Sequence, residues 1–245
     1  MHINYDKVAT TYDRHRRGGG PYLDRLISLA SQAHPRTVLE LGAGTGNNTL
    51  AFSLEYTGSR LLCLERSMGM LRQGARKPSG ASWIQGDALR IPLASGSVDF
   101  VFSIYMLHHI RHLEVLFGEC ARVLRQGCAV FVTTTHSFIQ RHPMARYFPS
   151  FAAIDTARFQ DVSQVARELS EAGFYQVDHA VCVADPTPVD SAYVQKVEGK
   201  FLSTFELMPQ DEFTSGLARL RKDVESQGAL PEPVAWESAL VWGYR

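Results

Sequence analysis

Short apolar runs alternate with amphipathic stretches through the first two thirds of the chain. The runs are apolar almost throughout, which is typical of parallel strands covered on both faces. They predict strands at residues 37–41, 60–65, 82–85, 99–103 and 129–133. The stretches between them predict helices at residues 23–33, 48–56, 68–75 and 113–124. This alternation favours crossover connections and an open α/β sheet.

The last third of the chain follows a different pattern. It predicts a helix at residues 162–172 that ends at Gly173, strands at 175–183 and 236–244, and helices at 191–201 and 209–226 between the strands. We therefore expect five parallel strands, an antiparallel edge pair and a helical cap. Residues 141–149 have no clear period and are expected to form a loop over the strand ends.

We expect one domain over residues 1–245. Within it, residues 1–34 are expected to form N-terminal lid helices, with the glycines at 18–20 as a hinge. Residues 141–160 and 185–230 are expected to form the cap on the substrate side.

A glycine-rich turn follows the first predicted strand. Gly42, Gly44 and Gly46 come directly after Glu40 and Leu41. In open α/β sheets, ligands bind outside the carboxyl ends of the strands. A dinucleotide fingerprint would place a glycine at the position of Asn47, and no phosphate-loop lysine follows. The pattern favours a ligand other than a pyrophosphate; a turn that serves only strand–helix packing is the alternative.

The order of motifs over residues 36–135 resembles class I S-adenosylmethionine-dependent methyltransferases, in particular the type 11 group related to ubiquinone and menaquinone C-methyltransferases. The motifs are residues 38–46, Glu65, residues 86–88, 97–101, 107–109 and 122–127. The resemblance implies a Rossmann-like, doubly wound, seven-stranded mixed sheet. It also implies S-adenosylmethionine as cofactor.

The resemblance assigns roles to individual positions. Glu65 is expected to accept the ribose hydroxyls, Asp87 the adenine amino group, and the Ala88 amide to donate to the adenine ring. Glu40 is expected at the methionine end, and backbone near Ser103 at the ammonium. A solvated strand-end charge at Glu65 and a simple turn former at Asp87 are the alternatives. The full set of expected cofactor contacts is Tyr5, Tyr12, Glu40, Gly42, Gly44, Gly46, Glu65, Arg66, Asp87, Ala88 and Ser103.

The N-terminal segment is similar to an opening pattern of the ubiquinone-type group. Tyr5 and Tyr12 lie seven residues apart. They are expected to fold over the methionine arm as a lid, where a cation–π contact to the sulfonium contributes ~0.5–2 kcal/mol. An amphipathic helix that packs on the core is the alternative.

Methyl transfer is an in-line displacement, so the enzyme mainly orients and desolvates the reactants. A base is needed only for a nucleophile that does not lose its proton unaided. His108 is the first candidate for a base or substrate contact, and His136 and Tyr12 follow. A histidine that structures the turn is the alternative at His108. Arg141 and His142 are candidate anchors for an anionic acceptor, or else part of a solvated loop.

Two other motifs give weaker signals. His108 and His112 share a helical spacing, but position 109 is not glutamate, so no zinc motif is predicted. The basic run at residues 14–17 could touch phosphates, although such a short run is usually solvated. The Asn/Asp-Pro-Pro-aromatic motif of many N-methyltransferases of this fold is missing after the fourth strand.

Composition narrows the class further. The 245 residues include 25 basic and 25 acidic side chains and are 45% hydrophobic. This balance argues against a nucleic-acid partner. No apolar run reaches the roughly 18–20 residues of a membrane helix, and the first residues lack a signal-peptide pattern. Four separate cysteines, of which Cys63, Cys128 and Cys182 lie in apolar runs, indicate buried free thiols and a cytoplasmic location.

The sequence thus predicts a methyltransferase that acts on oxygen, carbon or nitrogen of a small, partly apolar metabolite. Three alternatives stay open: a methyltransferase for tRNA or protein, a module that binds S-adenosylmethionine without turnover, and an NAD-dependent oxidoreductase, against which the glycine spacing counts.

Overall fold

The computed structural model describes residues 5–10, 12–14, 16 and 18–245, and over these residues seven strands form one sheet in the order β3-β2-β1-β4-β5-β7-β6. Neighbouring strands from β1 to β5 are parallel, whereas β7 runs antiparallel to β5 and to β6. The predicted Rossmann-like mixed sheet with an antiparallel edge pair is confirmed. The strands are β1 (Thr37–Leu41), β2 (Arg60–Glu65), β3 (Ser82–Gln85), β4 (Val98–Ile104), β5 (Leu124–Thr133), β6 (Tyr175–Val183) and β7 (Glu237–Tyr244).

Helices cover both faces of this sheet. On one face, α2 (Leu23–Ala33) and α3 (Asn47–Glu55) pack against Phe100 and Phe102 of β4. On the other face, α5 (Leu113–Val123) and α8 (Val162–Glu171) pack against Val101. Since successive strand residues point to opposite faces, a strand covered on both sides needs apolar residues at nearly every position. This is why the apolar runs marked the parallel strands.

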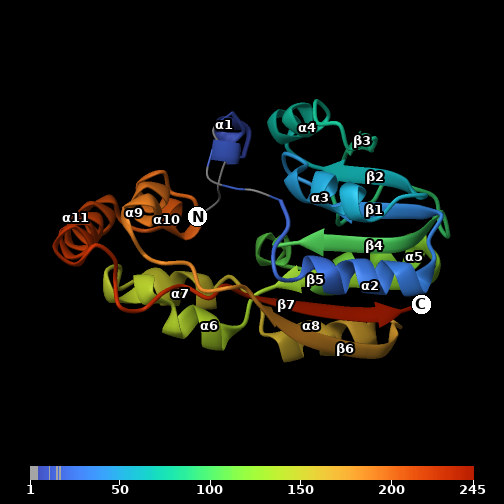
Figure 1. Cartoon of the computed structure of the whole chain (residues 1–245). Helices are drawn as coiled ribbons and strands as arrows, with labels where there is room; N and C mark the ends of the chain where they lie inside the picture. Colours follow the sequence, from blue (N-terminus) through green and yellow to red (C-terminus); the bar gives the residue numbers. More distant parts are fainter. Residues whose placement is uncertain (1–4, 11, 15, 17) are drawn as a thin grey trace.

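The cap has its own hydrophobic cluster. It is built from α6 (His136–Arg141), α7 (Phe151–Thr156), α9 (Ser191–Glu198), α10 (Thr204–Leu207) and α11 (Gln210–Gln227). These helices gather on the side toward which β4 points (Figure 1). Two chain segments separated by α8 and β6 therefore share one core beyond the carboxyl edge of the sheet.

The expected loop at residues 141–149 is wrong in part. Helix α6 reaches Arg141, and residues Pro143–Arg146 form a 3-10 helix. Side-chain caps explain both elements: Thr135 accepts the Phe138 N–H, and His142 accepts the Met144 N–H. Caps of this kind satisfy helix N-termini without requiring any hydrophobic period, so periodicity missed them.

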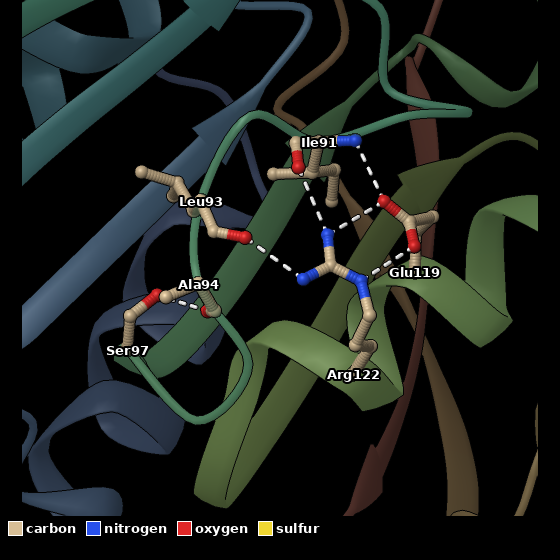
Figure 2. A network of polar contacts seen from close by, with 6 residues as sticks. All are labelled: Ile91, Leu93, Ala94, Ser97, Glu119 and Arg122. Atoms are coloured by element: carbon tan, nitrogen blue, oxygen red, sulfur yellow. Dashed lines mark hydrogen bonds and ion pairs between the residues drawn. The ribbon is translucent and has the colours of Figure 1, made fainter.

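A polar network joins the loop after β3 to helix α5 (Figure 2). The Arg122 guanidinium donates to both carboxylate oxygens of Glu119, at 2.6 and 2.8 Å, and to the backbone carbonyls of Leu93 and Ile91. Glu119 also accepts the Ile91 N–H at 2.7 Å. The arginine of the 122–127 motif thus holds the chain that leads from the Asp87 region into β4.

We expect Arg122→Ala to lower the free energy of unfolding by about 1–3 kcal/mol, because the carboxylate and two carbonyls lose a charged donor. Denaturant titration measures the change. Arg167→Ala is the matched control, since its 3.9 Å contact to Glu171 is exposed at both ends and should contribute under about 0.5 kcal/mol. Equal losses in the two variants would contradict this role of Arg122.

The four cysteines carry no disulfide; Cys63, Cys120 and Cys128 are buried, but Cys182 is only half-buried. The expectation of burial is wrong for Cys182 because β6, an edge strand, is exposed along much of its length. Among the described residues, no helix combines the length and the apolar character needed to cross a bilayer. The cytoplasmic location stays a prediction.

Candidate active site

A cavity of about 920 Å³ lies between the carboxyl ends of the parallel strands and the cap. Its volume is near the upper end of the roughly 300–1,000 Å³ typical of ligand pockets. One part is formed by the turns after β1, β2 and β3, including Gly44, Glu65 and Asp87. The other part is formed by the loop after β4 and by cap residues such as Phe151. The cavity is therefore bordered by two parts of different chemical character.

The glycine-rich turn forms part of this wall. Gly42 and Gly44 line the cavity and have φ values of +66° and +58°, which favour glycine. A Cβ at Gly44 would meet only the Gly42 carbonyl oxygen, at 4.0 Å, so the space beside it is open. Gly46 does not line the cavity. A Cβ there would lie 2.9 Å from the Trp83 ring, which shows that Gly46 faces packed side chains. The expected ligand contact at Gly46 is not supported; this glycine permits packing.

The acids at two strand ends lie in the same wall. Glu65 accepts the Gly44 N–H at 2.8 Å and the Ser67 N–H at 2.7 Å, so it fixes the turn after β1 against its own strand. Asp87 accepts the Leu89 N–H at 2.9 Å, which orients its carboxylate at the start of the next loop. Both line the cavity, as do Arg66 and Ala88. The geometry agrees with the expected cofactor contacts, which stay predictions until a ligand is seen.

Glu40 and Ser103 lie beneath the cavity rather than at its surface. Both are buried and neither lines it; Ile104, Tyr105 and Met106 line it instead of Ser103. Burial raises the pKa of the Glu40 carboxyl to about 8, although a hydrogen bond from Thr49 opposes the shift. The expected direct contact from Glu40 is not supported. Its carboxylate instead accepts the hydrogen bond from Thr49, which joins the end of β1 to α3.

The N-terminal segment is fastened across the cavity. Asp6 accepts hydrogen bonds from Ser67 Oγ at 2.7 Å and from the Gly69 N–H at 2.8 Å, and Tyr5 OH lies 2.9 Å from His109 Nε2. Tyr5 and Tyr12 line the cavity with ring centroids 6.2 Å apart. Residues 5–16, where described, therefore lie across the cavity, and their role as a lid stays a prediction.

A second attachment of the lid reaches the glycine-rich turn. Asp13 accepts from Thr45 Oγ1 at 2.5 Å and from Asn47 Nδ2 at 2.9 Å, and it pairs with Lys77 at 2.7 Å. The residue that departs from the dinucleotide pattern, Asn47, is thus part of the lid attachment.

Of the histidines proposed from the sequence, His108 lines the cavity and His136 does not. His108 lines the cavity with its ring stacked on Phe159 at 4.3 Å. Burial, and then the charges of His109 and Arg158, hold its pKa well below its usual value. The ring is neutral at pH 7. A low pKa makes it a weak base, so positioning of the acceptor is the simpler role.

His136 and Arg141 do not line the cavity. His136 Nε2 lies 2.6 Å from the Phe159 carbonyl oxygen, and Arg141 pairs with Glu237. The expected acceptor contacts of these two residues are not supported. Both follow β5 in sequence, but the turn into α6 directs them away from the cavity. His142 does line it.

Sequence reasoning missed Arg16. The basic run was expected to be solvated, yet Arg16 lines the cavity, donates from Nε to the Phe201 carbonyl at 2.7 Å and lies 3.8 Å from the centroid of the Tyr12 ring. His15 and Arg17 lie outside the described residues. Nothing in the local sequence distinguishes Arg16 from Arg14, which is exposed.

His112 pairs with Glu114 at 3.0 Å on the surface. Within the described ranges, no group of three histidine, cysteine or acidic residues could hold a metal ion.

Comparison with known proteins supports the resemblance of the motifs. Residues 39–132 match a family model described as a methyltransferase domain. A malonyl-[acyl-carrier protein] O-methyltransferase of Methylovorus sp. is 30% identical over 70% of this chain and 62% of its own length. A demethylmenaquinone methyltransferase of Thermobifida fusca is 30% identical over 50% of this chain and 56% of its own length. The chain thus spans less than two thirds of either relative.

A known crystal structure has a similar fold. A protein of Anabaena variabilis, described as a methyltransferase from an antibiotic biosynthesis pathway, has a TM-score of 0.74 and 24% identity over 90% of this chain and 95% of its own. The family match lies over the strands and turns that build the cofactor side of the cavity. Over residues 39–132, the chain is thus similar to methyltransferase domains, in agreement with the resemblance of its motifs.

Proposed function

We propose that this protein transfers a methyl group from S-adenosylmethionine to a small, partly apolar acceptor bound beneath the cap. The observation that carries the proposal is one cavity with two chemically different parts. Glycine backbone and two carboxylates form the first part, and aromatic side chains such as Phe138 and Phe151 form much of the second. A ligand in the first part would present its reactive end to a ligand in the second.

The residues of the first part fit S-adenosylmethionine. The open space at Gly44 admits a ligand close to the backbone, where any side chain would intrude. Glu65 and Asp87 would place negative charge beside a cationic cofactor, and their carboxylates could accept hydrogen bonds from the ribose hydroxyls and the adenine amino group. When bound, the cofactor supplies an activated methyl group.

The side chains of the protein then have to orient the two reactants and exclude water from them. Tyr5 and Tyr12 cover the cavity from the lid and exclude water, and the cap closes the opposite side. His108, neutral and stacked on Phe159, borders the space in which the acceptor would lie. Positioning within roughly 3–3.5 Å of the reacting carbon accounts for most of the acceleration in such a displacement. His108 and Tyr12 remain candidates for proton removal where the acceptor requires it.

The relatives do not decide the acceptor. One is described as a malonyl-[acyl-carrier protein] O-methyltransferase and the other as a demethylmenaquinone methyltransferase, so similar domains are described with chemically different acceptors. The family match includes the loop after β4, which borders the acceptor side, but the lid and cap residues that form the rest of that side lie outside the match.

Isothermal calorimetry of the intact chain with S-adenosylmethionine, and separately with NADH, tests the proposal. We expect binding of the first and none of the second; the reverse result would refute the proposal. Incubation of cell metabolites with methyl-labelled cofactor then tests turnover. Cofactor binding without transfer to any metabolite fraction, but with transfer to tRNA or protein, would identify a macromolecular acceptor. Binding with no transfer at all would identify a non-catalytic module.

We expect Glu65→Ala and Asp87→Ala each to weaken S-adenosylmethionine binding by about 1–3 kcal/mol, because each removes a charged hydrogen-bond acceptor. Calorimetry measures both. Glu171→Ala, an exposed acid of α8, is the control and should bind as the unmodified protein does. Unchanged affinity in both site variants would refute the assignment of these acids.

A further inference from the structure

His142 presents a buried polar atom without a partner. The side chain lines the cavity, only 3% of the residue is exposed, and Nε2 has no hydrogen-bond partner among the described residues. Nδ1 accepts the Met144 N–H at 3.2 Å. A neutral imidazole has one donor and one acceptor nitrogen, so the proton lies on Nε2. Burial lowers the pKa of this ring to about 4, which keeps it neutral at pH 7.

The surroundings of this donor are aromatic. The centroid of the His142 ring lies 5.3 Å from that of Phe138, 5.0 Å from that of Phe151 and 5.9 Å from that of Trp236. All three neighbours also line the cavity. The Phe138 and Trp236 rings also contact each other, with centroids 5.3 Å apart, so these side chains form one continuous aromatic wall. A flat apolar body can pack against such a wall with little conformational cost.

Three polar groups near His142 on this wall are already paired, whereas His108 Nδ1, which belongs to the loop after β4, has no partner among the described residues. Trp236 Nε1 donates to Tyr105 OH at 2.7 Å, and Tyr105 OH in turn lies 2.7 Å from Ser238 Oγ. Thr134 Oγ1 donates to the Glu237 carbonyl at 3.0 Å. Against this background, His142 Nε2–H is an unsatisfied donor, and such a group is costly to bury unless a ligand completes it.

The carboxylate of Asp155, which also lines the cavity, has hydrogen-bond partners within the protein. Asp155 accepts from Thr204 Oγ1 at 2.7 Å and from Arg158 at 3.1 Å, and Arg158 also donates to Ser203 Oγ at 3.0 Å. Each Asp155 oxygen therefore already accepts one hydrogen bond within the protein, whereas His142 Nε2–H still lacks an acceptor, which a ligand oxygen can supply.

We propose, on the basis of the proposed function, that the methyl acceptor has a flat apolar body and an unprotonated oxygen, such as a ring carbonyl, that accepts a hydrogen bond from His142 Nε2–H. The body lies among Phe138, Phe151 and Trp236. His142 is then a specificity-determining residue, which selects an oxygen and fixes the acceptor in one orientation.

The test uses two probes of matched shape, 1-indanone and indane, which differ in one ring carbonyl. Their binding is measured by calorimetry to the intact protein saturated with S-adenosylhomocysteine. We expect the ketone to bind about tenfold more tightly, the ratio that corresponds to one hydrogen bond to a buried donor. In His142→Asn the ratio should fall to within about twofold. Asparagine still caps the 3-10 helix but is too short to present the donor.

Thr135→Ala is the control variant. It removes the cap of the preceding helix, α6, but Thr135 does not line the cavity, so the ratio should stay near tenfold. Nitrogen-15 NMR of histidine-labelled wild-type protein gives an independent readout, in which a proton on Nε2 of His142 shifts with indanone and not with indane. This measurement needs no variant to fold.

Three results would overturn the inference: equal binding of the two probes, a ratio unaffected by His142→Asn, or a proton on Nδ1 instead of Nε2. A failure of indanone to bind at millimolar concentration would also overturn it. If the protein binds S-adenosylhomocysteine and only the probe results fail, the acceptor assignment falls while the proposed function stands. No S-adenosylhomocysteine binding at all would refute the proposed function itself.

Discussion

Replacing Glu40 with glutamine should remove a large pH dependence from the stability of the cofactor-free protein. Burial is the main cause that raises the pKa of this carboxyl from 4.5 to about 8, and the nearby Glu65 adds to the shift. Between these pH values, only the unfolded state releases the proton. The free energy of unfolding therefore falls as pH rises from about 4.5 through 8, by roughly 2–5 kcal/mol in total.

Glutamine keeps the oxygen that accepts the Thr49 hydroxyl hydrogen bond and has no proton to lose. The two proteins are compared by urea denaturation at pH 5, 6, 7, 8 and 9. We expect the difference in unfolding free energy to move steadily in favour of Glu40→Gln. His108 and His142, whose lowered pKa values make stability fall as pH falls below about 6.5, are present in both proteins and cancel in the difference.

Glu55→Gln is the matched control, because Glu55 is exposed on α3, the helix that carries Thr49. Its stability curve should run parallel to that of the unmodified protein. A parallel curve for Glu40→Gln as well would show that the Glu40 carboxyl is not protonated in the folded state at neutral pH.

The sheet could be predicted because its physical requirements are local. A parallel strand covered on both faces needs consecutive apolar residues, and β1, β2 and β3 have the predicted bounds. Helix ends were less predictable where tertiary packing, and not the local sequence, determines the last helical residue. The helix predicted at residues 191–201 ends at Glu198, and α10 forms a separate turn, because Gly199 and Lys200 leave the helical conformation before Phe201 joins the cap core.

The site could be predicted where an acidic residue stands at or just after the carboxyl end of a predicted parallel strand. Glu65 and Asp87 follow β2 and β3, and parallel strands bring such ends to one edge of the sheet. Glu40 and Ser103 do not line the cavity, although the expected backbone contact near Ser103 stays a prediction. Each is the last residue but one of its strand, β1 or β4. Because successive side chains of a strand point to opposite faces of the sheet, these two point into the core.

The acceptor side could not be predicted, because it depends on contacts between distant segments. Arg16 meets Phe201 across 185 residues, and Tyr5 meets His109 across 104. His142 acquires its chemical character from a local cap and from rings that come from elsewhere in the chain. Such contacts follow from how the lid and cap pack, and no local spacing encodes them.

Gly44→Val should weaken S-adenosylmethionine binding on the order of 100-fold while the protein stays folded. The position of the new side chain is open in the structure, so its methyl groups would project into the cavity beside Glu65 instead of into the core. Overpacking of a fitted site costs about 1–3 kcal/mol, and the upper end of that range corresponds to the stated factor. The φ of +58° adds strain for a β-branched residue, which lowers stability in the absence of ligand.

Gly80→Val separates strain from steric exclusion. Gly80 has a φ of +68°, no atom within 4 Å of its Cβ position and no place in the cavity wall, so valine there is strained in the same way but away from the ligand. We expect both variants to lose similar stability in thermal denaturation and only Gly44→Val to lose cofactor affinity in calorimetry. If the two variants bound the cofactor equally well, the ligand would not lie against the Gly44 backbone. The assignment of the glycine-rich turn, on which the cofactor half of the cavity depends, would then be wrong.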